Sequence, residues 1–103
     1  MAWHEVAEAL SLGDEEALGV RVAEREIALC RSRGELYALD NICTHQFAVL
    51  SEGYVEDGCI ECPLHQGRFS LATGAPLAPP VTEPVRVYPV RTEAGKVYVN
   101  LPD

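Results

Sequence analysis

The sequence has no long apolar run and few basic residues. No stretch approaches the ~18 consecutive apolar residues that span a bilayer, so the 103-residue chain predicts no membrane helix. Lysine and arginine number 8 against 16 aspartate and glutamate, which gives a formal net charge of -8. Because this charge repels phosphate backbones and anionic lipid surfaces, we expect neither nucleic acid nor membrane as a partner. A positively charged protein patch is the kind of partner that this charge favours.

Several other features are missing. The opening MAWHEVAEAL has no basic segment followed by an apolar stretch and a cleavage site, which predicts a cytoplasmic protein without a secretory signal. Its four cysteines are then expected to be metal ligands or plain thiols, because the cytosol keeps thiols reduced. Repeats, low-complexity tracts and linkers are also lacking, so we predict a single domain over residues 1–103.

Helical patterns are almost absent, and alternating apolar residues predict strands. Only LSLGDEEAL is a helix candidate, and its glycine favours a turn or one short helix. One predicted hairpin turns at residues 32–34 and a second at residues 94–95, where Val85 and Val87 are placed on the strand before the turn. Trp3 is predicted to pack in a buried first strand. An all-β fold follows, a small antiparallel sandwich or barrel.

Two short Cys/His motifs lie between the strand regions, CTH at residues 43–45 and CPLH at residues 62–65. Thiolate and imidazole together suit zinc, copper or an iron–sulfur cluster, whereas magnesium and calcium prefer oxygen ligands. One sulfur and one nitrogen per motif is unusual for structural zinc. It suits a two-iron cluster, in which one iron takes both cysteines and the other takes both histidines. The candidate metal and cofactor ligands are Cys43, His45, Cys62 and His65.

The two motifs together, with RGELYALDNICTH, CPLHQGRFSLATG and PVRVYPV around them, resemble the small Rieske ferredoxins of bacterial aromatic-ring dioxygenases. The resemblance covers most of the chain from about Ile27 onward and implies a Rieske fold with two cluster-binding loops. It also implies one [2Fe–2S] cluster, held by Cys43 and Cys62 on one iron and by His45 and His65 on the other.

The resemblance further implies a function. The protein would be an electron carrier, not itself an enzyme, between an NAD(P)H-dependent flavoprotein reductase and the terminal oxygenase of an aromatic-ring dioxygenase. The two histidines would form the exposed edge through which electrons leave. Neighbouring residues would make the transient contact with partners, and the candidates are Gln46, Phe47, Gln66 and Arg68. Pro79 and Pro80 resemble the proline loop that covers the cluster in this family.

The sequence departs from the respiratory members of the family at four positions. Those proteins add a cysteine to each loop and join the loops by a disulfide, whereas this chain has Ala48 and Leu64 there. They also carry a serine and a tyrosine whose hydroxyls donate to the cluster, where this chain has Gly67 and Phe69. Fewer donors stabilise the added electron less, so we expect a reduction potential near the lower end of the Rieske range, roughly -150 mV.

Two other functions remain open. The small Rieske subunit of assimilatory nitrite reductases has a similar size and motif, and a structural zinc module would use the same four ligands. Cys59 with Cys62 forms a Cys-x-x-Cys, which also occurs in redox dithiols and zinc knuckles. We expect Cys59 to be an ordinary strand residue, because the ligand set is complete without it. Cys30 is expected in the core or a strand, and His4 at the surface.

Overall fold

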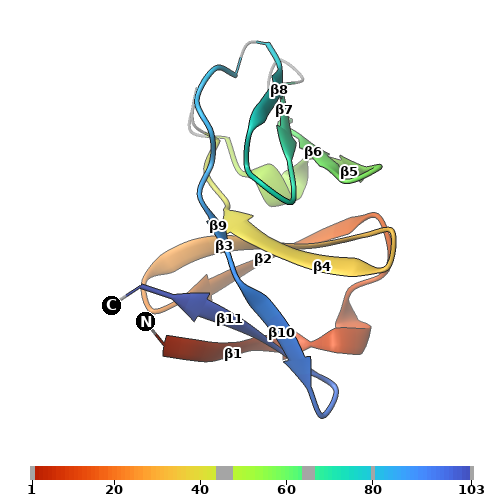
Figure 1. Ribbon diagram of the computed structural model, residues 1–103, viewed down its shortest axis with the longest axis vertical. Helices are drawn as coiled ribbons and strands as arrows, with labels where there is room; N and C mark the ends of the chain where they lie inside the picture. The colour runs from red at the N-terminus through yellow and green to blue at the C-terminus, as the bar shows by residue number, and fades with distance from the viewer. Residues whose placement is uncertain (1, 44–47, 64–66, 80, 103) are drawn as a thin grey trace.

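The computed structural model describes residues 2–43, 48–63, 67–79 and 81–102, and strands dominate this part of the chain. They form three sheets in which the neighbouring strands are antiparallel (Figure 1). A lower and a middle sheet make up the base, and an upper sheet stands above them. The expectation of a small antiparallel all-β fold is therefore confirmed.

The three sheets have simple strand orders. The lower sheet has the order β1-β11-β10, with β1 at Ala2–Glu8, β10 at Val90–Glu93 and β11 at Lys96–Leu101. The middle sheet has the order β2-β3-β4-β9, with β2 at Glu16–Val22, β3 at Arg25–Ser32, β4 at Glu35–Asp40 and β9 at Val87–Tyr88. The upper sheet has the order β5-β6-β7-β8, with β5 at Tyr54–Glu56, β6 at Cys59–Glu61, β7 at Arg68–Ser70 and β8 at Pro76–Ala78. Two single-turn 3₁₀ helices complete the described elements, η1 at Ala9–Ser11 and η2 at Leu50–Glu52.

Strand β3 lies between two apolar cores. Ile27 and Leu29 pack with the lower sheet, whereas Ala28 and Cys30 pack with the upper sheet, and all four are 0% exposed. Successive side chains of a strand point to opposite faces, so a strand that is buried on both faces reads as the continuous apolar run IALC. The middle sheet therefore contributes side chains to both apolar cores, one on each of its faces.

Two-residue turns with left-handed backbone join the main hairpins. Arg33 and Gly34 have φ of 54° and 79°, and Ala94 and Gly95 have φ of 53° and 78°, which confirms both predicted turn positions. Such turns match the twist of the strands that they connect. The turn between β2 and β3, at residues 23–24, has the same backbone but contains no glycine, so the sequence did not signal it.

Three sequence predictions need correction. Val87 belongs to β9 and pairs with β4, so the strand that precedes the turn at 94–95 is β10. Pro89 separates β9 from β10, and because proline has no N–H to donate, the chain changes sheets there. Trp3 lies on a strand as predicted, but it is 38% exposed and its ring lies 4.5 Å from the Arg91 guanidinium carbon. Val85 was also expected on a strand, but it lies between β8 and β9, outside the named strands.

Candidate metal centre

The first Cys/His segment (residues 43–48) begins just after β4 and is closed by backbone hydrogen bonds. The Leu50 N–H donates to the Asn41 carbonyl over 2.7 Å, and Ile42 pairs with Val49 in an isolated antiparallel bridge. At the end of this ladder the Cys43 N–H donates to the carbonyl oxygen of Ala48 over 2.9 Å. Cys43 is thus fixed at the last rung before the segment leaves the ladder.

The second Cys/His segment (residues 62–67) repeats this arrangement. Cys62 directly follows β6, and its N–H donates over 2.7 Å to the carbonyl oxygen of Gly67, which directly precedes β7. In both segments the cysteine N–H therefore bonds to the carbonyl of the residue five positions later. Two backbone frames of the same size present their cysteines from equivalent positions.

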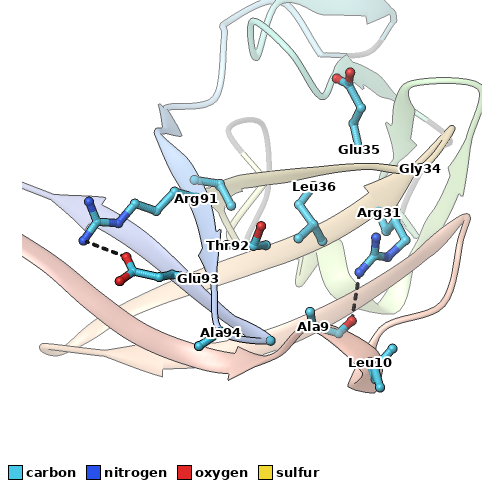
Figure 2. Close-up of a pocket in the computed structure, with 12 residues that line it drawn as sticks. Ala9, Leu10, Arg31, Gly34, Glu35, Leu36, Arg91, Thr92, Glu93 and Ala94 are labelled. Carbon is cyan, nitrogen blue, oxygen red and sulfur yellow. Dashed lines mark hydrogen bonds and ion pairs between the residues drawn. The ribbon is translucent and has the colours of Figure 1, made fainter.

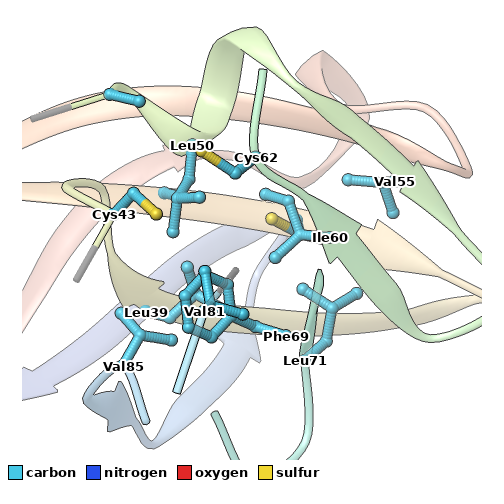
Figure 3. Packing of buried hydrophobic residues seen from close by; sticks show 13 residues of the cluster. Leu39, Cys43, Leu50, Val55, Ile60, Cys62, Phe69, Leu71, Val81 and Val85 are labelled. Carbon is cyan, nitrogen blue, oxygen red and sulfur yellow. The ribbon is translucent and has the colours of Figure 1, made fainter. Parts of the chain in front are cut away.

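Both cysteines lie in the core between the middle and upper sheets. Cys43 is 3% exposed and Cys62 is 1% exposed, and they belong to one buried cluster. Figure 3 shows them on the same side of that cluster, with Leu50 between them in this view. Apolar side chains thus shield both sulfur positions from water. Such an apolar shell controls the access of solvent to a metal–sulfur centre and thereby its redox potential.

The histidine ligands expected from the motif, His45 and His65, lie outside the described residues. So do the expected contact residues Gln46, Phe47 and Gln66, and also Leu64 and Pro80. Within the described ranges no three histidine, cysteine, aspartate or glutamate side chains gather into a metal site. The four-residue ligand set therefore stays a prediction from the motif.

A side-chain pair that sequence reasoning missed braces the first Cys/His segment. The Asn41 side chain accepts a hydrogen bond from the Ser51 N–H over 2.7 Å and donates to the Ser51 hydroxyl over 2.9 Å. Asn41 is only 3% exposed, so its amide depends on these partners. The pair packs against β2, where a Cβ added to Gly19 would stand 2.8 Å from Ser51 Oγ. The Asn41 side chain therefore links the residues just before the first Cys/His segment to the residues just after it.

At the second Cys/His segment, other parts of the chain pack closely against the backbone of two glycines. A Cβ added to Gly67 would stand 2.6 Å from Cγ1 of Val81, closer than carbon atoms pack. A Cβ added to Gly53 would overlap the carbonyl oxygen of Glu61, the residue before Cys62. The motif includes Gly67, but nothing local in the sequence indicates that Val81 packs against it. Nor does the sequence indicate that Gly53 lies against Glu61.

The remaining cysteines have positions that match expectation. Cys30 is buried in β3, and burial raises the pKa of its thiol to about 12, so the thiol stays protonated at neutral pH. Cys59 lies half-buried in β6, with Sγ 3.8 Å from the Asp57 carbonyl oxygen. None of the four cysteines, all of which the structure describes, forms a disulfide. His4 is partly buried on β1 and pairs with Val99.

Arg68, the described member of the expected contact residues, is half-exposed and forms an ion pair. Its Nε donates to Glu61 Oε1 over 3.1 Å, across neighbouring strands β7 and β6. The pair lies at the two ends of the second Cys/His segment, because Glu61 precedes Cys62 and Arg68 follows Gly67. Contact of Arg68 with a partner protein stays a prediction.

A groove of about 620 Å³ lies at the other end of the molecule, between η1, β4 and the β10–β11 turn. Figure 2 shows its polar groups engaged with one another: Arg31 donates to the carbonyl of Ala9 over 2.8 Å, and Arg91 pairs with Glu93 at 3.9 Å. None of its lining residues is a cysteine or a histidine. The groove therefore contains none of the expected ligands of the candidate metal centre.

Among the described residues there is no helix with the length and apolar character needed to cross a bilayer.

The similarity to known proteins covers nearly the whole chain. Residues 2–89 match the Rieske [2Fe-2S] domain family. The ferredoxin subunit of anthranilate 1,2-dioxygenase from Burkholderia cepacia is 48% identical over 99 residues, which are 96% of this chain and 92% of that protein. The Sphingomonas yanoikuyae B1 ferredoxin superposes with a TM-score of 0.93 at 36% identity, over 98% of this chain and 100% of that chain.

Two further solved structures bear on function. A chain from the complex of reduced oxygenase and oxidized ferredoxin in carbazole 1,9a-dioxygenase matches with a TM-score of 0.88 and 38% identity, over 94% of this chain and 91% of that chain. A putative NADH-dependent nitrite reductase small subunit from Mycobacterium tuberculosis matches with a TM-score of 0.83 at 28% identity, over 95% and 93% of the two chains. Sequence identity is thus higher to the dioxygenase ferredoxins than to this nitrite reductase subunit.

Proposed function

The chain belongs to the Rieske [2Fe–2S] family, and we propose that it is the ferredoxin of a multicomponent aromatic-ring dioxygenase. In this role it carries single electrons from an NAD(P)H-dependent flavoprotein reductase to the terminal oxygenase, in the cytoplasm. Bond-making chemistry belongs to the oxygenase, so the protein is a carrier and not an enzyme by itself. The formal net charge of -8 suits brief docking on a positively charged partner surface.

One observation carries the proposal. The 48% identical relative from Burkholderia cepacia is named a dioxygenase ferredoxin subunit, and the match spans 92% of its length. The same class of partner is supported by the 38% identical chain that was solved in complex with an oxygenase. Similarity over nearly the full length, rather than over a shared motif alone, favours the same role.

Membership in the family implies a [2Fe–2S] cluster, and the described residues fit it. Two buried thiols in one core match the sulfur side of the cluster, and two equal backbone frames match a centre held between two segments. We propose that Cys43 and Cys62 bind one iron and that His45 and His65 bind the other. When bound, the cluster accepts and releases one electron at a time.

The chain's own residues prepare this site. Leu50 and Phe69 are 0% exposed and belong to the same apolar core as Cys43 and Cys62. They exclude water from the side of the site where the sulfur atoms lie. Phe69 has no hydroxyl to donate, unlike the tyrosine of respiratory members. An aromatic side chain without a donor leaves the reduced state less stabilised, which supports a low potential suited to a nicotinamide-linked reductase.

Reconstitution tests the proposal. The purified protein should be reddish brown, contain iron and acid-labile sulfide in equal amounts, and be required for aromatic oxidation by a reductase and oxygenase of this class. Cys62→Ser should remove the colour and the activity, while Cys30→Ala, which alters a cysteine outside the ligand set, should keep both. Turnover that proceeds equally well without the protein would contradict the proposed role. A colourless protein that contains zinc would support the zinc module instead.

The nitrite reductase alternative rests on the solved small subunit of similar fold. Tight copurification with a sirohaem protein, with no effect on aromatic oxidation, would favour that function over ours.

A further inference from the structure

Three turns meet on the side of the molecule away from the points where the chain crosses between the base and the upper sheet. One is the turn at residues 14–15, which leads into β2. The others are the two-residue turns at 33–34, between β3 and β4, and at 57–58, between β5 and β6. We call this junction the three-turn clasp. In Figure 1 it lies on the right, whereas the crossings lie on the left.

The Glu15 carboxylate bonds to both of the two-residue turns. Its Oε1 accepts from the Ser32 hydroxyl over 2.9 Å and from the Arg33 N–H over 3.3 Å. Its Oε2 accepts from the Asp57 N–H over 3.0 Å. One oxygen thus binds the middle sheet and the other binds the upper sheet. Hydrogen bonds from amides to a carboxylate are among the stronger ones in proteins.

The other two turn amides are satisfied by neighbours of Glu15. The Gly34 N–H donates to Asp14 Oδ1 over 3.0 Å, and the Gly58 N–H donates to the Ser32 hydroxyl over 2.8 Å. Ser32 is 0% exposed, so its hydroxyl passes the contact from Gly58 on to Glu15 without water. All four central N–H groups of the two turns therefore end on the segment 14–15, directly or through Ser32.

The backbone at Glu15 is unusual. Its φ of 60° lies in the left-handed region, which residues other than glycine, asparagine and aspartate seldom adopt. The same backbone occurs at Ala23 and Glu24, so what sets Glu15 apart is the set of hydrogen bonds that its carboxylate accepts.

Apart from these hydrogen bonds, the base and the upper sheet are joined by two chain crossings, a shared apolar core and an exposed ion pair between Arg33 and Asp57 at 3.8 Å. The first crossing follows Asp40, and the second returns through residues 81–87 (Figure 1). A body attached at two points can still turn about the line between them. Apolar packing resists such motion without fixing a direction, whereas a third, hydrogen-bonded attachment on the opposite side fixes the orientation.

We propose that Glu15 is a positioning residue for the candidate metal centre. Its carboxylate fixes the turn at 57–58, and with it β6, which runs directly into Cys62. Together with the Gly58–Ser32 hydrogen bond, this side chain sets the orientation of the upper sheet on the base, and hence the way in which the metal centre is presented to a partner. The consequence for electron transfer rests on the proposed function, but the anchoring itself does not.

Amide hydrogen exchange tests the anchoring. Glu15→Ala removes both acceptor oxygens, so exchange at the Arg33 and Asp57 amides should speed up by about tenfold, the factor expected for the loss of one hydrogen bond to a charged group. Exchange at the distant Ala94–Gly95 turn should not change. Unchanged exchange at Arg33 and Asp57 would overturn the proposal whatever the protein's function.

Glu15→Gln is the milder variant, in case the alanine variant folds poorly. A carboxamide has one oxygen that accepts hydrogen bonds and one NH₂ group that donates them. Its oxygen can accept from one of the two turns, but its NH₂ group then faces the backbone N–H of the other turn, and no hydrogen bond forms there. Exchange should then rise at only one of Arg33 and Asp57. Glu24→Gln is the matched control, because Glu24 also has a left-handed backbone, with φ of 67°, but belongs to the turn between β2 and β3. A similar rise in the control would contradict a specific role for Glu15.

Electron transfer tests the consequence. The reduced protein is mixed either with ferricyanide, a small oxidant with no docking requirement, or with a dioxygenase terminal oxygenase. Loss of positioning should slow transfer to the oxygenase by about tenfold while transfer to ferricyanide stays within about twofold. Equal slowing of both would indicate general damage and overturn positioning. If the wild-type protein reduces ferricyanide but never the oxygenase, the proposed function fails, and the exchange result still decides the anchoring.

Discussion

The two Cys/His segments share one backbone frame but are held in place by different forces. The first is braced by a polar pair, in which the buried amide of Asn41 binds both the backbone and the hydroxyl of Ser51. The second is braced by contact of carbon atoms, because Val81 packs where a side chain at residue 67 would stand. Equal frames therefore do not imply equal energetics.

The difference follows from where each segment lies. The first segment leaves the six-residue strand β4 and returns through η2, so polar groups on both sides meet at its base. The second segment joins β6 and β7, strands of only three residues, and it depends on the chain that returns over it. Removal of polar atoms should therefore weaken the first segment, and addition of volume should weaken the second.

The largest effect is expected at Gly53, which lies between the two segments in the chain. Gly53 follows η2, which closes the first segment, and a Cβ there would overlap the Glu61 carbonyl at the start of the second. Backbone atoms cannot move aside as a flexible side chain does, so Gly53→Ala should lower the free energy of unfolding by about 3 kcal/mol. Urea denaturation measures it. Gly13→Ala is the control, since its added Cβ meets only the end of the Glu16 side chain; equal losses for the two variants would contradict this account.

Gly67→Ala should have the next largest effect. The new methyl group would press on Val81, and the strain should cost about 2 kcal/mol of unfolding free energy. Val81→Ala makes room, so the double variant should recover part of the loss. A double variant that is destabilised by the sum of the two single changes would show that the two residues do not interact, and the description of the second segment would be wrong.

Asn41→Ala tests the first segment and should cost slightly less, about 1.5 kcal/mol, because it leaves the Ser51 N–H without its acceptor in a buried place. Asn41→Asp keeps that acceptor but loses the donor to the hydroxyl. Loss of the iron–sulfur cluster to an iron chelator, measured by visible absorbance without urea, should be faster in both variants than in the wild-type protein. Release at the wild-type rate would place the support of this segment elsewhere.

The contrast between the segments also explains which parts of the fold the sequence could predict. Long strands with a buried face leave an alternating pattern, so the β3–β4 hairpin and the turn at 94–95 were predicted correctly. Strands of three residues are too short to show a period. The four-stranded order of the upper sheet was therefore not predicted.

For the candidate site, the four-residue ligand set stays a prediction from the motif, and the structure describes its two cysteines, both buried in one core. The supporting residues were not predicted. Asn41 and Ser51 meet only because the first segment closes, and Glu15 meets Asp57 only because two sheets pack together. Such pairs depend on contacts between distant parts of the chain, and no local pattern reports them.

The smallest effect should come from the ion pair that flanks the second segment. Arg68 and Glu61 are 3.1 Å apart, but the Arg68 side chain is 52% exposed, and exposed pairs contribute roughly 0–1 kcal/mol because water and salt screen them. Arg68→Gln should therefore change the unfolding free energy by less than about 0.5 kcal/mol. The small difference should vanish in about 1 M salt, where screening acts within ~3 Å. A loss as large as that of Gly67→Ala, persisting in salt, would mean that charge rather than packing holds the second segment, and the contrast with the first segment would then disappear.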